Sequence, residues 1–307
     1  MTASTPLETQ LEPDPDPGRQ RVAADSGSRV RARRRAGAPG RGRGRKQGAL
    51  LRLRAEIPLS ARIALAVGGV AGLLALWWFA ATVLSTNAVL VPTPGAAWRA
   101  AADYWDSGEL GTDFVASATR VIKGYSISMG VGIVLGLAIG SFRSVEAFWE
   151  SPIGFLRYIP ATALVPLFLA WLGIDEPPKV ALVIAGTVFF NIVMMADVAR
   201  LVPREMILAA YTLGAGRARV MGRVVLPHCL PGMIDVARVN LAAAWPMLVV
   251  AELLAATDGL GYRLTVFRRG QEWDQIFAIL VVFAVIGITS DLFLRWLRNR
   301  VSPWARS

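Results

Sequence analysis

The chain has 307 residues, of which 54% are hydrophobic, and its mean hydropathy is +0.46, yet it carries a formal net charge of +11. This combination is typical of a polytopic membrane protein with basic cytosolic segments. The single cysteine, Cys229, and the single histidine, His228, exclude an internal disulfide framework and any metal site built from several cysteines or histidines.

Residues 1–57 differ in composition from the rest of the chain. They are polar and proline-rich, and they include the arginine-rich stretch "RVRARRRAGAPGRGRGRK". Such a segment buries too little apolar surface to fold, so we expect a disordered basic cytosolic tail, followed by a membrane domain over 58–307. The tail is either an arm for anionic lipid or nucleic acid, or a solvated segment that fixes topology. The second interpretation is favoured because no aromatic residue interleaves the arginines.

Six charge-free windows then predict membrane spans. The first window, "IALAVGGVAGLLALWWFAATVL", can cross a bilayer alone, and the others reach the required length of roughly 20 residues with their semi-polar flanks. The predicted inner segments hold 25 Lys and Arg residues and the outer segments five, which predicts both termini in the cytosol. The fold class is therefore an all-α polytopic membrane protein with six transmembrane helices, at 63–84, 124–142, 158–174, 180–196, 239–251 and 275–290.

Two windows carry distinctive residue patterns. In the second window, small residues recur at every fourth position and predict a helix-packing seam, within the bundle or between protomers. These residues are Gly124, Ser128, Gly132, Gly136 and Gly140. In the third window, Pro160 and Pro166 each remove an amide donor and crowd the preceding turn, so they predict a kinked or locally unwound helix.

The basic loop after the fourth window begins with "PREMILAAYTL" (203–213), which predicts a short amphipathic helix. Its predicted face is formed by Met206, Ala210 and Leu213. The helix should end at "GAG", where Gly214 can take a positive φ. A second basic segment follows, and Pro227 and Pro231 are predicted to turn the chain back to the membrane. From the residues alone, the helix either docks into a partner or lies flat on lipid headgroups.

The same loop resembles the loop motif of bacterial ABC importer permeases: two alanines, three residues, a glycine, a spacer of about a dozen residues and Leu-Pro. The matching residues are Ala209, Ala210, Gly214, Leu226 and Pro227. The flanking stretches "LRYIPATALVPLFLAWLGI" and "AELLAATDGLGYRL" are similar to the subgroup that imports nitrate, sulfonates, taurine and similar small solutes. The resemblance covers roughly 115–298. One departure is Leu208, which occupies the position of the motif's glutamate, while Glu205 lies one turn earlier on the same face.

This resemblance implies the transmembrane subunit of an ATP-driven importer in the cytoplasmic membrane. It implies a homodimer that binds two cytosolic ATPase subunits through a coupling helix at 203–216 and receives solute from an extracytoplasmic binding protein. The implied docking residues are Glu205, Leu208, Ala209, Ala210, Leu213, Gly214, Ala215 and Pro227. ATP and Mg²⁺ would be used by the partner, since this chain contains no Gly-Lys pair and hence no phosphate-binding P-loop. Membrane lipids are expected partners, and nucleic acid is not.

Asn191, Trp245 and Glu252 are candidate pathway or structural residues within the spans. We expect Glu252 to be clamped by Arg120 or Lys123 at the outer level, or to face the solute, because an isolated buried charge is costly. A secondary transporter would need ionisable groups near the midplane, and its only candidates, Glu252 and Asp197, fall near span ends. An intramembrane enzyme lacks a visible nucleophile and base, and a nucleic-acid binder would depend on the tail alone.

Overall fold

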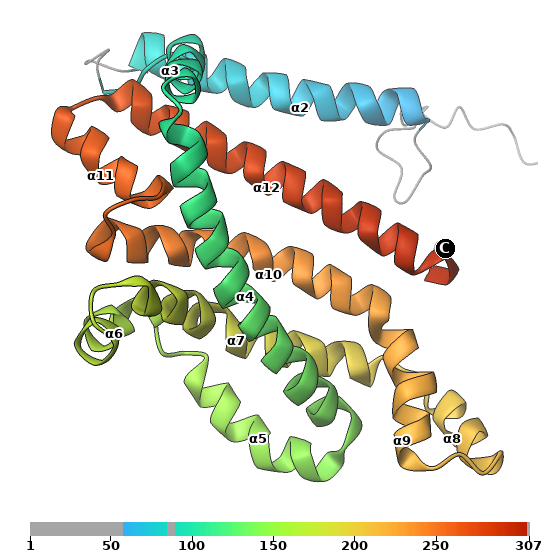
Figure 1. The fold of residues 1–307 in the computed structure, drawn as a ribbon. Helices are drawn as coiled ribbons and strands as arrows, with labels where there is room; N and C mark the ends of the chain where they lie inside the picture. The colour runs from blue at the N-terminus through green and yellow to red at the C-terminus, as the bar shows by residue number, and fades with distance from the viewer. Residues whose placement is uncertain (1–57, 85–89, 306–307) are drawn as a thin grey trace, which may run out of the picture. The chain divides into compact units, whose positions relative to one another are not determined.

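The computed structural model describes residues 58–84 and 90–305, and every regular element among them is helical. The predicted tail, 1–57, lies outside these residues. The chain divides into two units, Met1–Gly69 and Val70–Ser307, with the boundary inside the first described helix. The elements, labelled in Figure 1, are α2 (Leu59–Phe79), η2 (Ala80–Leu84), α3 (Pro94–Asp106), α4 (Glu109–Ser141), α5 (Arg143–Leu156), η3 (Ala161–Leu164), α6 (Val165–Leu172), α7 (Glu176–Arg200), α8 (Arg204–Thr212), α9 (Arg217–Val220), η4 (Met221–Val225), α10 (Leu226–Ala255), α11 (Leu260–Gly270), α12 (Trp273–Val301) and η5 (Pro303–Ala305).

Five helical stretches among these residues are long and apolar enough to cross a membrane, and the bent pair α5–α6 adds a sixth if it counts as one span. The expectation of an all-α, multi-pass protein is therefore confirmed. The helices extend beyond the predicted windows because their polar ends continue the helical backbone; α4, for example, has 33 residues. Which end faces the cytosol stays a prediction.

The third predicted span differs most from the structure. The window 158–174 is not one continuous helix: α5 comes before it, and α5 and α6 meet at an angle of 77°. The predicted disruption at the prolines is confirmed, because Pro160 lies in the break and Pro166 lies in the first turn of α6. Proline removes a helical donor and disfavours the helical conformation in the residue before it. Hydropathy misses α5 because this helix carries Arg143, Glu146 and Glu150.

The small-residue stripe of α4 packs against α7, so the predicted seam is confirmed within the bundle. A Cβ placed on Gly132 would lie 2.6 Å from the Cβ of Asn191, and one on Gly140 would lie 2.6 Å from the Cβ of Ala199. In both pairs, the two residues are separated by the same number of positions along the chain. The two helices therefore run parallel and keep one register, and glycine is required where the backbones approach so closely.

The chain enters a membrane-spanning helix at Pro227 and Pro231, and it does so without a break in the helix, although the ribbon bends between α9 and α10 (Figure 1). Pro227 lies in the first turn of α10, where a missing N–H is tolerated, and α10 continues through Pro231. The π-helical turn η4 joins α9 to α10, so that Arg217–Ala255 forms one candidate span. The loop between α7 and this span is therefore shorter than the sequence suggested.

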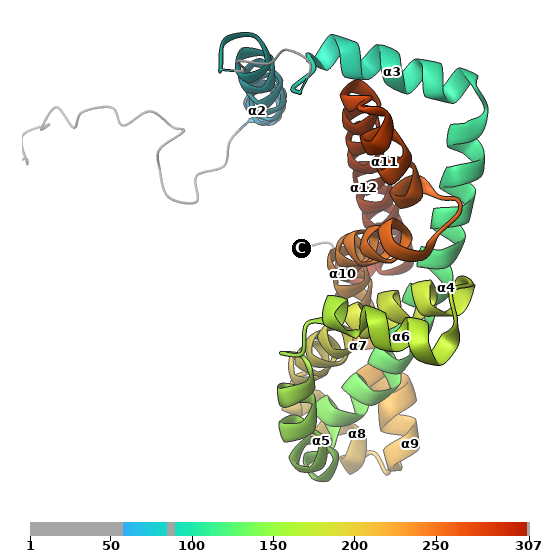
Figure 2. The ribbon, with the colours of Figure 1, turned by 90° about the vertical axis from the view of Figure 1, so that its left-hand side faces the viewer.

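α10 and α12 run antiparallel, as an ion pair and a ring contact show. Arg298 Nε lies 3.1 Å from Asp235 Oδ2, and the rings of Trp245 and Phe283 meet edge to face with centroids 5.9 Å apart. Figures 1 and 2 both show α3 lying against α12. In Figure 1, α8, α9 and the C-terminal end of α12 lie at one end of the second unit, which we call the α8 end, and α3, α6 and α11 lie at the other, the α11 end.

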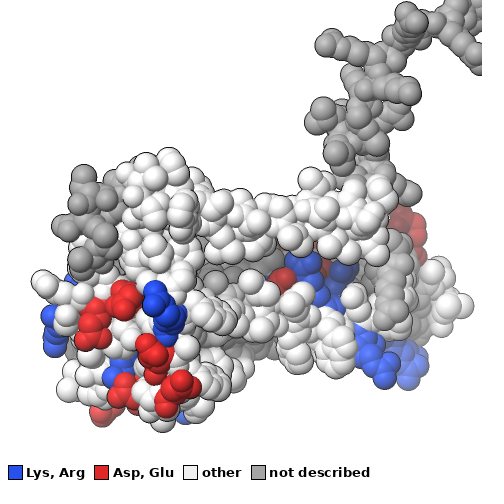
Figure 3. All heavy atoms as spheres, turned by 90° about the horizontal axis from the view of Figure 1, so that it is seen from above, with Lys and Arg blue, Asp and Glu red and all other residues white. Residues whose placement is uncertain are grey.

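Charged side chains on the face drawn in Figure 3 gather toward these two ends. Acidic and basic side chains mix at the α11 end, and basic ones predominate at the α8 end.

Candidate functional site

The sequence-predicted docking segment forms the helix α8. Pro203 precedes it and Glu205 lies in its first turn, where an acidic side chain complements the helix dipole. The helix ends in a Schellman motif: the Gly214 N–H donates to the Tyr211 carbonyl at 2.9 Å, and the Ala215 N–H donates to the Ala210 carbonyl at 3.0 Å. Gly214 has a φ of +76°, which only glycine adopts at little cost.

One face of α8 is held by the bundle and the other is exposed. Ile207, Ala210 and Ala215 pack against a core cluster that contains Val220 and Val225. Elsewhere around α8 and at its C-cap, large apolar side chains are exposed: Met206 45%, Leu208 53%, Tyr211 45% and Leu213 87%. Of the predicted face, Ala210 packs against this cluster, whereas Met206 and Leu213 are largely exposed. These exposed apolar side chains are the part of the α8 segment that is open to a partner.

The remaining docking candidates fall into two groups. Glu205, Ala209 and Gly214 are exposed on or beside α8, and a Cβ on Gly214 would meet nothing within 4 Å. Pro227 is also exposed, but it belongs to the first turn of α10 and is separated from α8 by α9 and η4. The structure thus keeps the residues between 205 and 215 together and places Pro227 on another helix.

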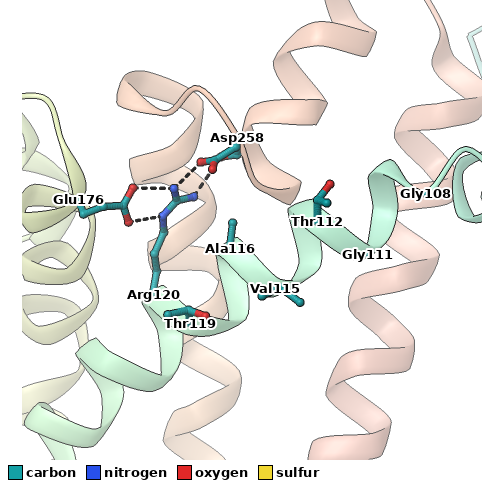
Figure 4. A pocket seen from close by; sticks show the side chains of 9 residues that line it. All are labelled: Gly108, Gly111, Thr112, Val115, Ala116, Thr119, Arg120, Glu176 and Asp258. Atoms are coloured by element: carbon teal, nitrogen blue, oxygen red, sulfur yellow. Dashed lines mark hydrogen bonds and ion pairs between the residues drawn. The ribbon is translucent and has the colours of Figure 1, made fainter.

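At the α11 end, Arg120 of α4 is the centre of a cluster of ion pairs (Figure 4). Its Nε and Nη2 each donate to the carboxylate of Glu176 at 2.7 Å, and its Nη1 donates to Glu252 Oε1 at 2.7 Å. Nη1 and Nη2 also bond the backbone carbonyl and the carboxylate of Asp258. Lys179 Nζ adds a bond of 2.9 Å to Glu176. All five N–H groups of Arg120 are therefore used within the protein.

The expected clamp on Glu252 is confirmed, with Arg120 as the partner. Glu252 also accepts hydrogen bonds from Ser117 Oγ at 2.8 Å and from the Gly261 N–H at 2.8 Å. A Cβ on Gly259, which has a φ of +105°, would lie 2.5 Å from Glu252 Oε1. The glycines of "DGLGY" thus allow the α10–α11 loop to close over the carboxylate. Whether Glu252 also serves transport stays a prediction.

The carboxylates of the Arg120 cluster border an open pocket of about 740 Å³ at the α11 end. The side chains of Glu176 and Asp258 are 57% and 56% exposed, whereas that of Arg120 is 4% exposed. The pocket therefore presents negative rather than positive charge. Figure 4 shows its lining: Gly108, Gly111, Thr112, Val115, Ala116, Thr119, Arg120, Glu176 and Asp258.

Asp113 of α4 forms a second cluster that sequence reasoning missed. It accepts hydrogen bonds from Tyr104 Oη at 2.6 Å, from Arg263 Nε at 2.7 Å and from the Gly259 N–H at 2.8 Å. Burial, and then the hydrogen bond to the Asp113 carboxylate, raise the pKa of Tyr104, so this phenol stays a donor. The cluster ties α3 and α11 to α4. A single aspartate with no sequence neighbour of interest gives no signal from which this role could have been found.

Asn191 belongs to a polar chain in the middle of the bundle. Its Nδ2 donates to Ser128 Oγ at 2.9 Å, and its Oδ1 accepts from Asn240 Nδ2 at 2.7 Å. Thr187 Oγ1 donates to the same Ser128 hydroxyl at 2.7 Å. Trp245 is half-buried among the apolar side chains between α10 and α12. Neither residue belongs to the Arg120 cluster, and no group of three His, Cys, Asp or Glu side chains in the described ranges is placed to hold a metal ion.

Comparison with known proteins gives the family. Residues 129–304 match the model described as "Binding-protein-dependent transport system inner membrane component". The taurine transport system permease protein TauC of Escherichia coli (strain K12) is 32% identical over 259 residues, which cover 82% of this chain and 94% of that protein. The bicarbonate transport system permease protein CmpB of Synechococcus elongatus is 27% identical over 187 residues, covering 60% and 67%.

Among solved structures, a bacterial ABC transporter involved in the import of the acidic polysaccharide alginate contains a similar chain. The TM-score is 0.57 at 14% identity, over 80% of this chain and 94% of that chain, which shows a shared fold. The family model spans more than half of the sequence, and the multi-pass helical fold agrees with it. The chain therefore belongs to the binding-protein-dependent transport system inner membrane components, as a permease of an ABC importer in the inner membrane.

Proposed function

We propose that this permease imports a small solute that carries an anionic group, of the sulfonate, taurine or nitrate type, driven by ATPase subunits that dock on α8. The observation that carries the docking is the set of exposed apolar side chains around α8, a helix that packs on the bundle through Ile207 and Ala210. A surface that is apolar, exposed and rigidly supported is typical of a partner interface. The solute class is supported by the two relatives named for taurine and bicarbonate.

The proposed assembly is a homodimer of this chain, with two ATPase subunits at the α8 end and an extracytoplasmic binding protein at the α11 end. The predominance of basic side chains at the α8 end supports a cytosolic position for it. ATP would be bound and hydrolysed by the ATPase subunits. Closure of their dimer would displace α8, and the core cluster beneath it, which includes Met195 of α7 and Cys229 of α10, would pass the motion to the bundle.

The docking can be tested at Gly214. We expect Gly214→Trp to insert in the membrane normally and to lose co-purification of the ATPase subunit, because the indole fills the open space beside α8. The loss of binding-protein-stimulated ATP hydrolysis should be roughly tenfold or more, which corresponds to about 1.4 kcal/mol of binding free energy.

Two controls separate bulk from backbone strain. Gly214→Asn, which tolerates a positive φ, should retain the ATPase subunit. Gly108→Trp has a matched φ of +77° and equally open space, but it lies at the α11 end and should also retain it. Normal co-purification and stimulation in Gly214→Trp would refute docking on α8.

A further inference from the structure

The bent pair α5–α6 must carry the chain across the membrane. α4 and α7 are parallel, since Gly132 faces Asn191 and Gly140 faces Ala199 in one register. The end of α4 and the start of α7 therefore lie at opposite ends of this helix pair. The chain between them, 142–175, has to return over the full length of the pair, which a re-entrant loop would not do. The break between α5 and α6 consequently lies within the crossing.

This break places irregular backbone at membrane depth. α5 has 14 residues, which correspond to about 21 Å of helix, so the break at 157–160 falls well inside a hydrocarbon core of about 30 Å. Among the described residues, no backbone N–H donates to the carbonyls of Arg157, Tyr158 or Ile159. Such backbone is tolerated in a membrane only where protein or water covers it, and all three residues are exposed in the isolated protomer.

The break also exposes a cation. Arg157 forms no ion pair with any residue between 90 and 305. Within the described part of the chain, the only polar contacts of its side chain are with Tyr158, through a hydrogen bond of 3.1 Å from Nη2 to the phenol and a cation–π contact of 4.9 Å. Tyr158 is itself 74% exposed. The cavity of about 180 Å³ beside Arg157 also contains Glu150 and Arg200, but Arg200 is already bonded to two carboxylates. An arginine facing lipid at this depth would be strongly unfavourable.

We propose that Arg157 and Tyr158 line the solute pathway, covered by the second copy of this chain, and bind the anionic group of the solute as it passes. This inference rests on the proposed import of an anion. Arg120 cannot serve this role without losing existing bonds, because its five side-chain N–H groups are occupied. The Arg157 side chain, by contrast, donates to nothing but a phenol among the described residues. A planar guanidinium with free donors and an adjacent phenol suits a sulfonate or carboxylate group.

The proposal can be tested by thiol labelling, without knowing the solute. In a Cys229→Ala background, Ile159→Cys places a thiol beside Arg157 in the complete complex, reconstituted in vesicles. Its reaction rates with anionic sulfonatoethyl methanethiosulfonate and with the cationic trimethylammonium analogue are compared, each relative to a free thiol. We expect the anionic reagent to be favoured at least roughly tenfold, as for unit charges about 8 Å apart at an effective dielectric near 20.

Arg157→Gln should bring this ratio close to that of a free thiol, and Arg157→Lys should retain most of it. Arg143→Gln is the matched control, since Arg143 lies at the other end of α5 with a side chain 98% exposed, and the ratio should not change. The proposal is overturned if the thiol introduced by Ile159→Cys reacts with neither reagent, with and without nucleotide, or if the ratio survives Arg157→Gln. Normal binding of the ATPase subunit to Gly214→Trp would instead count against docking on α8, and the labelling ratio would still decide the role of Arg157.

Discussion

Replacing Glu252 with glutamine preserves the size of the side chain and removes one charge from the Arg120 cluster. The Glu252 and Arg120 side chains are 0% and 4% exposed, and removing one partner of such a buried pair costs about 3–5 kcal/mol. Arg120 would keep the half-exposed carboxylates of Glu176 and Asp258, and glutamine can still accept a bond from Ser117. We therefore expect Glu252→Gln to lower the free energy of unfolding by about 2 kcal/mol.

The assay is denaturant unfolding of the purified protein in detergent, followed by tryptophan fluorescence. In an Arg120→Gln background, Glu252→Gln should cost about 1–3 kcal/mol less than in the wild type, the coupling expected for contacting residues. Glu109→Gln is the control: its pair with Arg263 is 3.0 Å long, but Glu109 is 51% exposed, so the loss should stay below about 1 kcal/mol. Equal costs of Glu252→Gln in both backgrounds would refute the clamp.

Two further predictions address packing and topology. Gly132→Ala should destabilise the protein by about 1–3 kcal/mol, since the new methyl group meets the Asn191 side chain, whereas Gly130→Ala on the open side of the same helix should be neutral or stabilising; equal effects on the unfolding free energy would contradict the α4–α7 seam. A reporter active only outside the cytosol should be active when fused after Asp106 and silent after Gly214, and the reverse pattern would invert the proposed orientation.

Apolar windows and small-residue spacing were sufficient to predict most of the fold. Five windows lie in candidate spans, and the stripe through Gly132 packs as its spacing indicates. The third crossing was placed too late in the chain. Its first half, α5, carries Glu146 and Glu150, so its hydropathy resembles that of a loop. A helix that is partly shielded by neighbouring helices can carry such charges, and this shielding is a tertiary property that no local window contains.

An ion pair of the site could be predicted where only a few residues of opposite charge lie at the same level of the membrane. Glu252 had two basic candidates at its level, and the structure selects Arg120. By contrast, Glu176 and Asp258 join the same guanidinium from distant parts of the chain, and no periodicity relates them to Arg120. Which apolar side chains of α8 are buried was not predicted, because a helix of nine residues has too few turns for a pattern to decide it.

The glycine contacts between α4 and α7 have a mechanical consequence. From Gly124 to Gly140, over about 24 Å, the glycines of α4 leave no room for even a Cβ between its backbone and α7, so few side chains between the two helices could slide or repack. We therefore expect α4 and α7 to move together as one rigid unit. One end of it carries the Arg120 cluster, and the other leads through three residues, 201–203, into α8. A tilt imposed at α8 would rotate α4 and α7 as one unit and so move the α11 end. The flexibility of this part of the protein is then concentrated in residues 201–203 and in the break between α5 and α6.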